Sequence, residues 1–182
     1  MDRDQSYDVQ STTPTTSGNR FPAENSTSCV PSVMRGTLGY DWTALTNSVN
    51  AMTAGGSTNQ TIGLAWGMQS LNQGVPLNAP AVDPDATNVI ILLSDGMNTQ
   101  NRWSGDGSNQ SSAVDARMTL ACTNAKAAKI EIYTILVMAG NSTVLQNCAS
   151  SSSKYFALTT AGAIITTFNQ IGQTLANLHL SR

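Results

Sequence analysis

The chain has 182 residues and a formal net charge of −2, and 40% of its residues are hydrophobic whereas only 11% are charged. This length fits one domain with a sizeable core. The low charge provides no basic footprint for nucleic acid or an anionic membrane surface. Ser, Thr, Asn and Gln replace the usual charged residues, which is more typical of an exported surface protein than of a cytosolic enzyme. No apolar run approaches the ~20 residues of a membrane span.

The first third of the chain contains little that predicts a buried strand. Residues 1–35 are rich in Ser, Thr, Pro and Asn, so we expect an irregular polar segment there. A short amphipathic helix is predicted over 41–52, with Asp41 as its N-cap and an apolar stripe of Trp42, Leu45, Val49 and Met52. After a loop at 54–60, a second helix is predicted over 61–71, with faces formed by Ile62, Ala65, Trp66 and Gln69 and with Gly63 and Gly67 packed close to a sheet.

The most informative stretch is 88–99, in which the apolar run Val89 to Leu93 ends in Ser94-Asp95-Gly96. A short apolar run without alternation predicts a strand that is buried on both faces of a sheet. Asp95 then lies just beyond the carboxyl end of a strand, where ligands bind in open α/β sheets. Asp-Gly is also a common turn pair, so Asp95 is either a turn residue or a ligand of a divalent cation.

The rest of the chain alternates between helices and strands. A long polar loop is expected over 98–112, facing solvent, and the elements after it are helices at 113–129, 141–148 and 161–178 and strands at 130–137 and 154–158. This order predicts an α/β fold with a parallel sheet of about three to four strands. The run Val89 to Leu93 is too apolar for an edge strand, so we expect another strand beside it.

The three cysteines are Cys29, Cys122 and Cys148, none of them in a CxxC pair. With a single histidine, His179, the chain has too few ligands for a zinc site. The cysteines are either buried free thiols or one disulfide with a thiol left over.

Two stretches resemble metal-binding motifs of von Willebrand factor A domains. The first reads Gly55-Gly-Ser-Thr-Asn-Gln-Thr-Ile-Gly-Leu64 and includes Ser57 and Thr58, and the second is Ser94-Asp95-Gly96. The resemblance implies a Rossmann-like three-layer fold with a metal-ion-dependent adhesion site (MIDAS) at the carboxyl edge of the sheet. It also implies that Thr58 and Asp95 are ligands of Mg²⁺, or of Mn²⁺ or Ca²⁺.

Residues 36–182 also resemble TadG-like pilus-assembly proteins of the bacterial envelope. The resemblance rests on Thr58 to Gly67, Asn88 to Trp103, Asp115-Ala-Arg117, Leu145 to Ala149 and the closing Thr166 to Gly172. It implies a periplasmic or surface location, a parent protein anchored in the inner membrane, and a pilus or envelope protein as the partner. Export in turn implies a disulfide between Cys122 and Cys148 and leaves Cys29 unpaired.

The first metal-binding motif of the family, Asp-x-Ser-x-Ser after an apolar strand, is absent from the sequence. Partial imitations begin at Asp4 and Asp106, but neither follows a strand, so we exclude both as ligands. We therefore expect residues 36–182 to form a partial domain, from a clipped or truncated protein, whose incomplete site binds metal weakly.

The function that these observations favour is a non-enzymatic adhesion or assembly module of a pilus system. One alternative is a metal-dependent hydrolase, because the stretch from Asn88 to Met97 also resembles a metal-ligand strand of alkaline-phosphatase-like enzymes. Such an enzyme needs several more carboxylate and histidine ligands and a nucleophile. The other alternative is a fragment with no activity of its own.

Overall fold

The structure is a computed structural model and describes residues 37–53, 55–75, 77–81, 85–101, 104–138 and 142–180. The polar segment at 1–35 and the expected free thiol of Cys29 lie outside this range. Each helix and strand predicted between 41 and 178 is present, with ends that differ by three residues or fewer.

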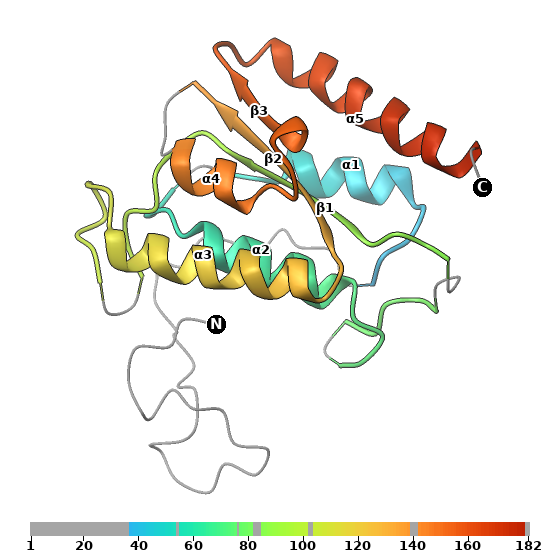
Figure 1. The fold of residues 1–182 in the computed structure, drawn as a ribbon, viewed down its shortest axis with the longest axis horizontal. Coiled ribbons are helices and arrows are strands. Elements are labelled where there is room, and N and C mark those ends of the chain that lie inside the picture. Colours follow the sequence, from blue (N-terminus) through green and yellow to red (C-terminus); the bar gives the residue numbers. More distant parts are fainter. Residues whose placement is uncertain are drawn as a thin grey trace, which may run out of the picture.

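A three-stranded parallel sheet forms the centre of the fold. Its strands are β1 (Val89–Ser94), β2 (Glu131–Val137) and β3 (Tyr155–Leu158), in the spatial order β1-β2-β3. Val89 is aligned with Glu131, and Thr134 with Tyr155. Helices cover both faces of the sheet: the two helices that connect the strands lie on one face, and the helix that follows the last strand lies on the other (Figure 1). This arrangement confirms the predicted three-layer α/β class.

One face of the sheet is covered by α2 (Gln60–Ser70), α3 (Ser112–Ala127) and α4 (Ser142–Cys148) (Figure 1). The core on this side consists of Leu64, Ile90, Met118, Cys122, Ala125, Ile130, Ile132, Val144 and Cys148. Cys122 and Cys148 form a disulfide that joins α3 to α4, which is the pair implied by the family resemblance.

The opposite face is covered by α5 (Ala163–Leu180). Its Ile171 is fully buried against alternate residues of β2, namely Tyr133, Ile135 and Val137. Ile164 and Leu175 pack around this cluster, whereas Phe168 of the same helix is 40% exposed. No helix in the described part of the chain is long and apolar enough to cross a membrane.

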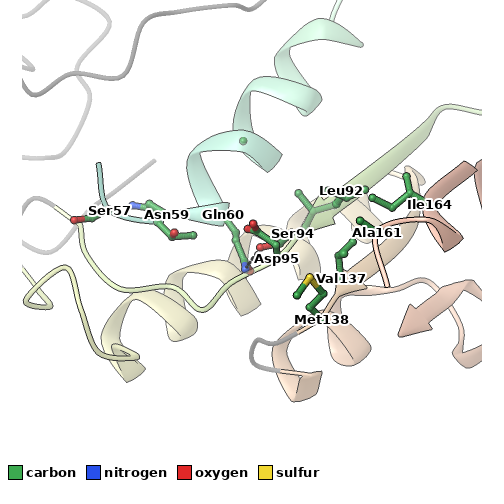
Figure 2. A pocket seen from close by; sticks show the side chains of 13 residues that line it. Ser57, Asn59, Gln60, Leu92, Ser94, Asp95, Val137, Met138, Ala161 and Ile164 are labelled. Carbon is green, nitrogen blue, oxygen red and sulfur yellow. Dashed lines mark hydrogen bonds between the residues drawn. The ribbon is translucent and has the colours of Figure 1, made fainter. Parts of the chain in front are cut away.

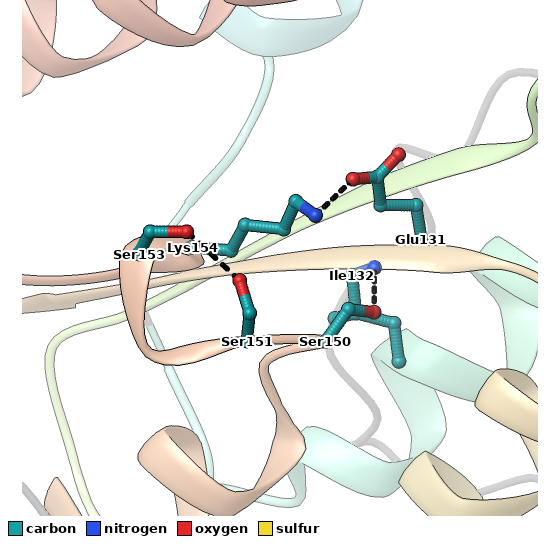
Figure 3. Close-up of polar contacts among 6 residues, drawn as sticks. All are labelled: Glu131, Ile132, Ser150, Ser151, Ser153 and Lys154. Carbon is teal, nitrogen blue, oxygen red and sulfur yellow. Dashed lines mark hydrogen bonds and ion pairs between the residues drawn. The ribbon is translucent and has the colours of Figure 1, made fainter.

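Polar contacts align β3 with β2 at the amino ends of the two strands (Figure 3). Ser150 donates its backbone N–H to the carbonyl of Ile132, and its hydroxyl accepts the N–H of Ile132 at 2.9 Å. After the short 3₁₀ helix η3 (Ser152–Lys154), the ammonium of Lys154 pairs with the carboxylate of Glu131. This ion pair joins the start of β3 to the start of β2.

The position of β1 corrects one prediction. Within the described residues β1 pairs only with β2 and is an edge strand, and the side chain of Leu93 is 42% exposed. Alternate residues do pack as expected, because Ile90 faces α2 and α3 whereas Val89 and Ile91 face the α5 side. The apolar sequence correctly indicated a strand, but not one that is buried on both faces along its whole length.

Most of the large apolar residues that the sequence indicated on the first two helices are exposed. In α1 (Trp42–Asn50) no residue is buried; Trp42 and Val49 are exposed, and so is Met52, which follows the helix. In α2 the buried residues are Gln60, Thr61 and Leu64, whereas Ile62 and Trp66 are exposed. Gly67 does approach the sheet, since a Cβ there would lie 3.3 Å from Ile90 Cδ1, but Gly63 has nothing within 4 Å.

Candidate functional site

Thr58 lies in the loop immediately before α2 and is fixed through its backbone. Its N–H donates to the hydroxyl of Thr99 at 2.9 Å. Its carbonyl accepts the N–H groups of Thr99 at 2.9 Å and of Gln100 at 3.3 Å. These bonds attach the loop before α2 to the segment that follows β1, so the position of Thr58 depends on that segment.

Asp95 follows the last residue of β1, at the carboxyl edge of the sheet. A Cβ on the adjacent Gly96 would lie 3.8 Å from the hydroxyl oxygen of Thr58, so this hydroxyl lies beside the turn that carries Asp95. Thr58 and Asp95 line the same cavity, which has a volume of about 600 Å³ (Figure 2). The fold therefore brings the two predicted ligands to one site.

The other predicted site residues support this turn. The side-chain amide of Gln60 donates to the hydroxyl of Ser94 at 2.7 Å and to the carbonyl of Gly96 at 2.9 Å. The hydroxyl of Ser57 donates to Gln100 Oε1 at 2.8 Å, and Figure 2 shows Ser57 turned away from Asp95. The hydroxyls of Ser57 and Ser94 are thus engaged in holding the two loops.

Asn98 supports the site from outside the cavity, a role that the sequence did not reveal. Its side chain is 1% exposed, accepts the backbone N–H of Gln60 at 2.8 Å and donates to the carboxylate of Asp115 at 2.9 Å. The prediction that the 98–112 loop faces solvent is therefore wrong at its start, where Thr99 and Asn101 are buried as well. Buried amides are tolerated because these hydrogen bonds satisfy them.

The rest of this loop depends on two glycines and one aspartate. Gly105 and Gly107 have φ values of 91° and 83°, and a Cβ on Gly107 would lie 2.6 Å from Ser57 Oγ. Asp106 accepts the N–H groups of Ser108 and Asn109, each at 2.8 Å, and these bonds lower its carboxyl pKa to about 2. Asp106 is outside the cavity and acts as the cap of its own turn.

The cavity has a polar half and an apolar half. The polar half consists of Ser57, Thr58, Asn59, Gln60, Ser94 and Asp95. The apolar half, from the ends of β1 and β2 and the start of α5, consists of Leu92, Leu93, Val137, Met138, Ala161 and Ile164. Figure 2 shows the two halves side by side, with Asp95 between them.

The oxygen atoms present do not complete a site for a divalent cation. Mg²⁺ and Ca²⁺ take six or more oxygen ligands, usually with several carboxylates or waters. In the cavity the carboxylate of Asp95 and the hydroxyl of Thr58 remain for such an ion, together with Asn59 Oδ1, which is buried and has no hydrogen-bond partner among the described residues. The described residues contain no cluster of three or more His, Cys, Asp or Glu side chains that could hold a metal.

Comparison by sequence finds no matching family model and no matching curated protein. Comparison by structure finds the pilus adhesin SpaC from Lactobacillus rhamnosus GG, at 16% identity and a TM-score of 0.52, over 73% of this chain and 21% of that one. It also finds proximal thread matrix protein 1 from the mussel byssus with a zinc-occupied MIDAS motif, at 17% identity and a TM-score of 0.48, over 71% and 28%.

At this identity, the likeness to SpaC concerns the fold alone. Three parallel strands with helices on both faces, matched over most of this chain, form a fold of the von Willebrand A type. The match spans only 21% of the length of SpaC and 28% of the length of the mussel protein.

Proposed function

We propose that this chain is a non-enzymatic protein-binding module of the adhesion or assembly kind, and that it acts in a Tad-type pilus system of a bacterial envelope. The observation that carries the proposal is the cavity at the carboxyl edge of the sheet, where Thr58 and Asp95 meet. In open α/β folds this edge is where ligands bind.

Three further features support the proposal. The fold match with a pilus adhesin supports an adhesive role, and the Cys122–Cys148 disulfide is of the kind that persists in exported proteins. The cavity is half apolar, which suits the contact surface of a protein partner better than a site for a small polar substrate.

A cation has a secondary role in this proposal. Asp95 and Thr58 would be its ligands, and waters or a partner's carboxylate would have to supply the remaining positions. We therefore expect weak binding of Mg²⁺, Mn²⁺ or Ca²⁺ to the isolated chain. Calorimetric titration with each ion measures this directly, and tight binding that Asp95→Asn abolishes would contradict the expectation.

The proposal is tested with the purified major pilin of the bacterium that encodes the chain. We expect saturable binding of this pilin to the immobilised chain in biolayer interferometry, and loss of that binding in Asp95→Ala. Asp41→Asn is the matched control, because Asp41 caps α1 by accepting the N–H of Ala44 and Asn is an equally good cap. Absence of pilin binding, or turnover of p-nitrophenyl phosphate with zinc and magnesium, would overturn the proposal.

A further inference from the structure

The cavity at the edge of the sheet carries an uncompensated negative charge. Among the 13 residues that line it, Asp95 is the only one with a charged side chain. Asp95 is exposed, and no other residue in the described part of the chain forms an ion pair with it. The electrostatic complement of such a cavity is a ligand with a positive charge.

The acceptors around Asp95 are too few for a divalent metal ion but suit an ammonium group. The hydroxyls of Ser94 and Ser57 are engaged with Gln60 and Gln100. An ammonium carries three N–H donors and needs only a few acceptors, whereas a divalent cation needs about six oxygen ligands. The carboxylate of Asp95 and the hydroxyl of Thr58 supply two acceptors of the right kind, and solvent at the open mouth supplies a third.

The wall next to Asp95 is apolar and accessible. The side chains of Leu93 and Met138 are 42% and 69% exposed, and both line the cavity together with Ile164. The backbone of Met138 is in the left-handed region, with φ at 68°, and its N–H donates to the carbonyl of Leu158 at 2.7 Å. A flexible hydrocarbon stem can lie along this wall while its charged end stays near water.

From this juxtaposition we infer that the cavity binds the side chain of a lysine on the partner protein. The ammonium is placed at Asp95 and Thr58, and the four-carbon stem lies against Leu93 and Met138. The inference rests on the proposed function as a protein-binding module, but it requires no metal ion. The positive charge at Asp95 would come from the lysine ammonium of the partner and not from a bound metal ion.

The probe is n-pentylamine, whose ammonium and first four carbons match a lysine side chain and whose fifth carbon corresponds to the lysine Cα. We expect saturable shifts of the Thr58 and Gly96 amide signals in nitrogen-15 correlation spectra, at pH 7 with EDTA present. Pentanol and pentanoate under the same conditions should not saturate these signals. Asp95→Asn should raise the dissociation constant about tenfold or more, since a hydrogen bond to a charged group is lost. Asp41→Asn should bind as the unaltered chain does.

A second variant tests the apolar wall. Pentylamine should bind more tightly than methylamine, and Leu93→Ser should reduce that difference while the spectrum stays dispersed. Equal binding of the two amines, or equal binding of pentylamine to Asp95→Asn, would overturn the inference.

The outcomes separate the inference from the proposed function. Binding of pentanoate only with Mg²⁺ present, without binding of pentylamine, would overturn the lysine site and leave a metal-bridged adhesion module. Binding of pentylamine without binding of the pilin would retain the lysine site and overturn the pilus partner.

Discussion

Asn98 Oδ1 accepts the backbone N–H of Gln60 at 2.8 Å, across 38 residues of sequence. The same side chain donates to Asp115 in α3, so a single amide joins the start of α2, the segment after β1 and the start of α3. Each of these elements carries or supports a residue of the cavity. The geometry of the site therefore depends on a residue that does not line it.

Removal of this amide should destabilise the whole domain. In Asn98→Ala the N–H of Gln60 and the carboxylate of Asp115 each lose a buried partner, which costs about 2 to 4 kcal/mol of unfolding free energy. Urea denaturation measures the loss. Asn177→Ala, on the exposed surface of α5, is the control and should change stability by less than about 0.5 kcal/mol. Equal stability of the two variants would contradict the role given to Asn98.

A side chain at Gly105 should distort the loop that holds Thr58. Its φ of 91° is unfavourable for other residues, and a Cβ would lie 2.9 Å from Gln100 Cα and in contact with the carbonyl of Thr99. We expect Gly105→Ala to lower the unfolding free energy by more than about 1 kcal/mol and to shift the Thr58 amide signal. Gly172→Ala in α5, with nothing within 4 Å, should instead raise stability by about 0.5 to 1 kcal/mol.

Loss of the disulfide between α3 and α4 should lower the free energy of unfolding. Cys122 and Cys148 are 26 residues apart, and the entropy of closing such a loop corresponds to about 3.5 kcal/mol. We expect the Cys122→Ala, Cys148→Ala double variant to lose roughly this amount in denaturant titrations. Addition of a reductant should destabilise the unaltered chain and leave the double variant unchanged.

Acid should loosen the turn at Asp106. Its pKa falls from 3.8 to about 2, because the N–H and side-chain amide of Asn109 and the N–H of Ser108 bond to the ionised carboxylate. A lowered folded-state pKa stabilises the turn above pH 3.8, and this contribution is lost as the pH falls towards 2. Carboxyl carbon-13 titration should give a midpoint near 2, and the amide signals of Ser108 and Asn109 should move with it. A midpoint near 4 would exclude these bonds in solution.

The hydroxyl of Tyr133 should be dispensable for stability. Tyr133 is 3% exposed, and its buried hydroxyl has no hydrogen-bond partner among the described residues. Tyr133→Phe should leave the melting temperature unchanged or raise it, because burial of an unpaired hydroxyl is unfavourable. The exposed Tyr40 gives the control Tyr40→Phe, and a clear loss of stability in Tyr133→Phe alone would reveal a partner for this hydroxyl.

The burial of the Tyr133 hydroxyl also predicts how the stability of the fold changes at alkaline pH. Desolvation and the nearby charge of Glu131 raise the pKa of Tyr133 above 10.0, although Lys154 acts in the opposite direction. A raised folded-state pKa means that this contribution is present below pH 10 and is lost as the pH rises through the folded-state value. Tyr133→Phe should therefore reduce the decline of stability above pH 10.

The elements of the fold could be predicted because the signals for them are local. The strand predicted from the run Val89 to Leu93 and the helix predicted over 161–178 both lie within two residues of the observed ends of β1 and α5. The position of β1 at the edge could not be predicted, because it depends on which strands pair with it. The burial of Asn98 was missed for the same reason, since its partners Gln60 and Asp115 are distant in sequence.

In the candidate site, too, the residues in local motifs could be predicted from the sequence, whereas those brought together by the fold could not. Thr58 and Asp95 were predicted from short motifs, and the cavity contains both. The apolar wall was not predicted, because Leu93, Met138 and Ile164 come from three elements and resemble ordinary core residues in sequence. Ser57 and Ser94 were predicted as residues of the site beside the two ligands, but the bonds of their hydroxyls to glutamine side chains are visible only in three dimensions.

The covalent link between α3 and α4 also has a mechanical consequence. Strand β2 lies within the 26-residue interval that the bridge closes, so tension applied to the two ends of the chain cannot extend that interval. About 90 Å of contour length stays locked when the rest of the domain is stretched. A module in a fibre under load would therefore lengthen less on unfolding than its residue count implies, and it would keep its central strand tethered to two helices from which it can refold.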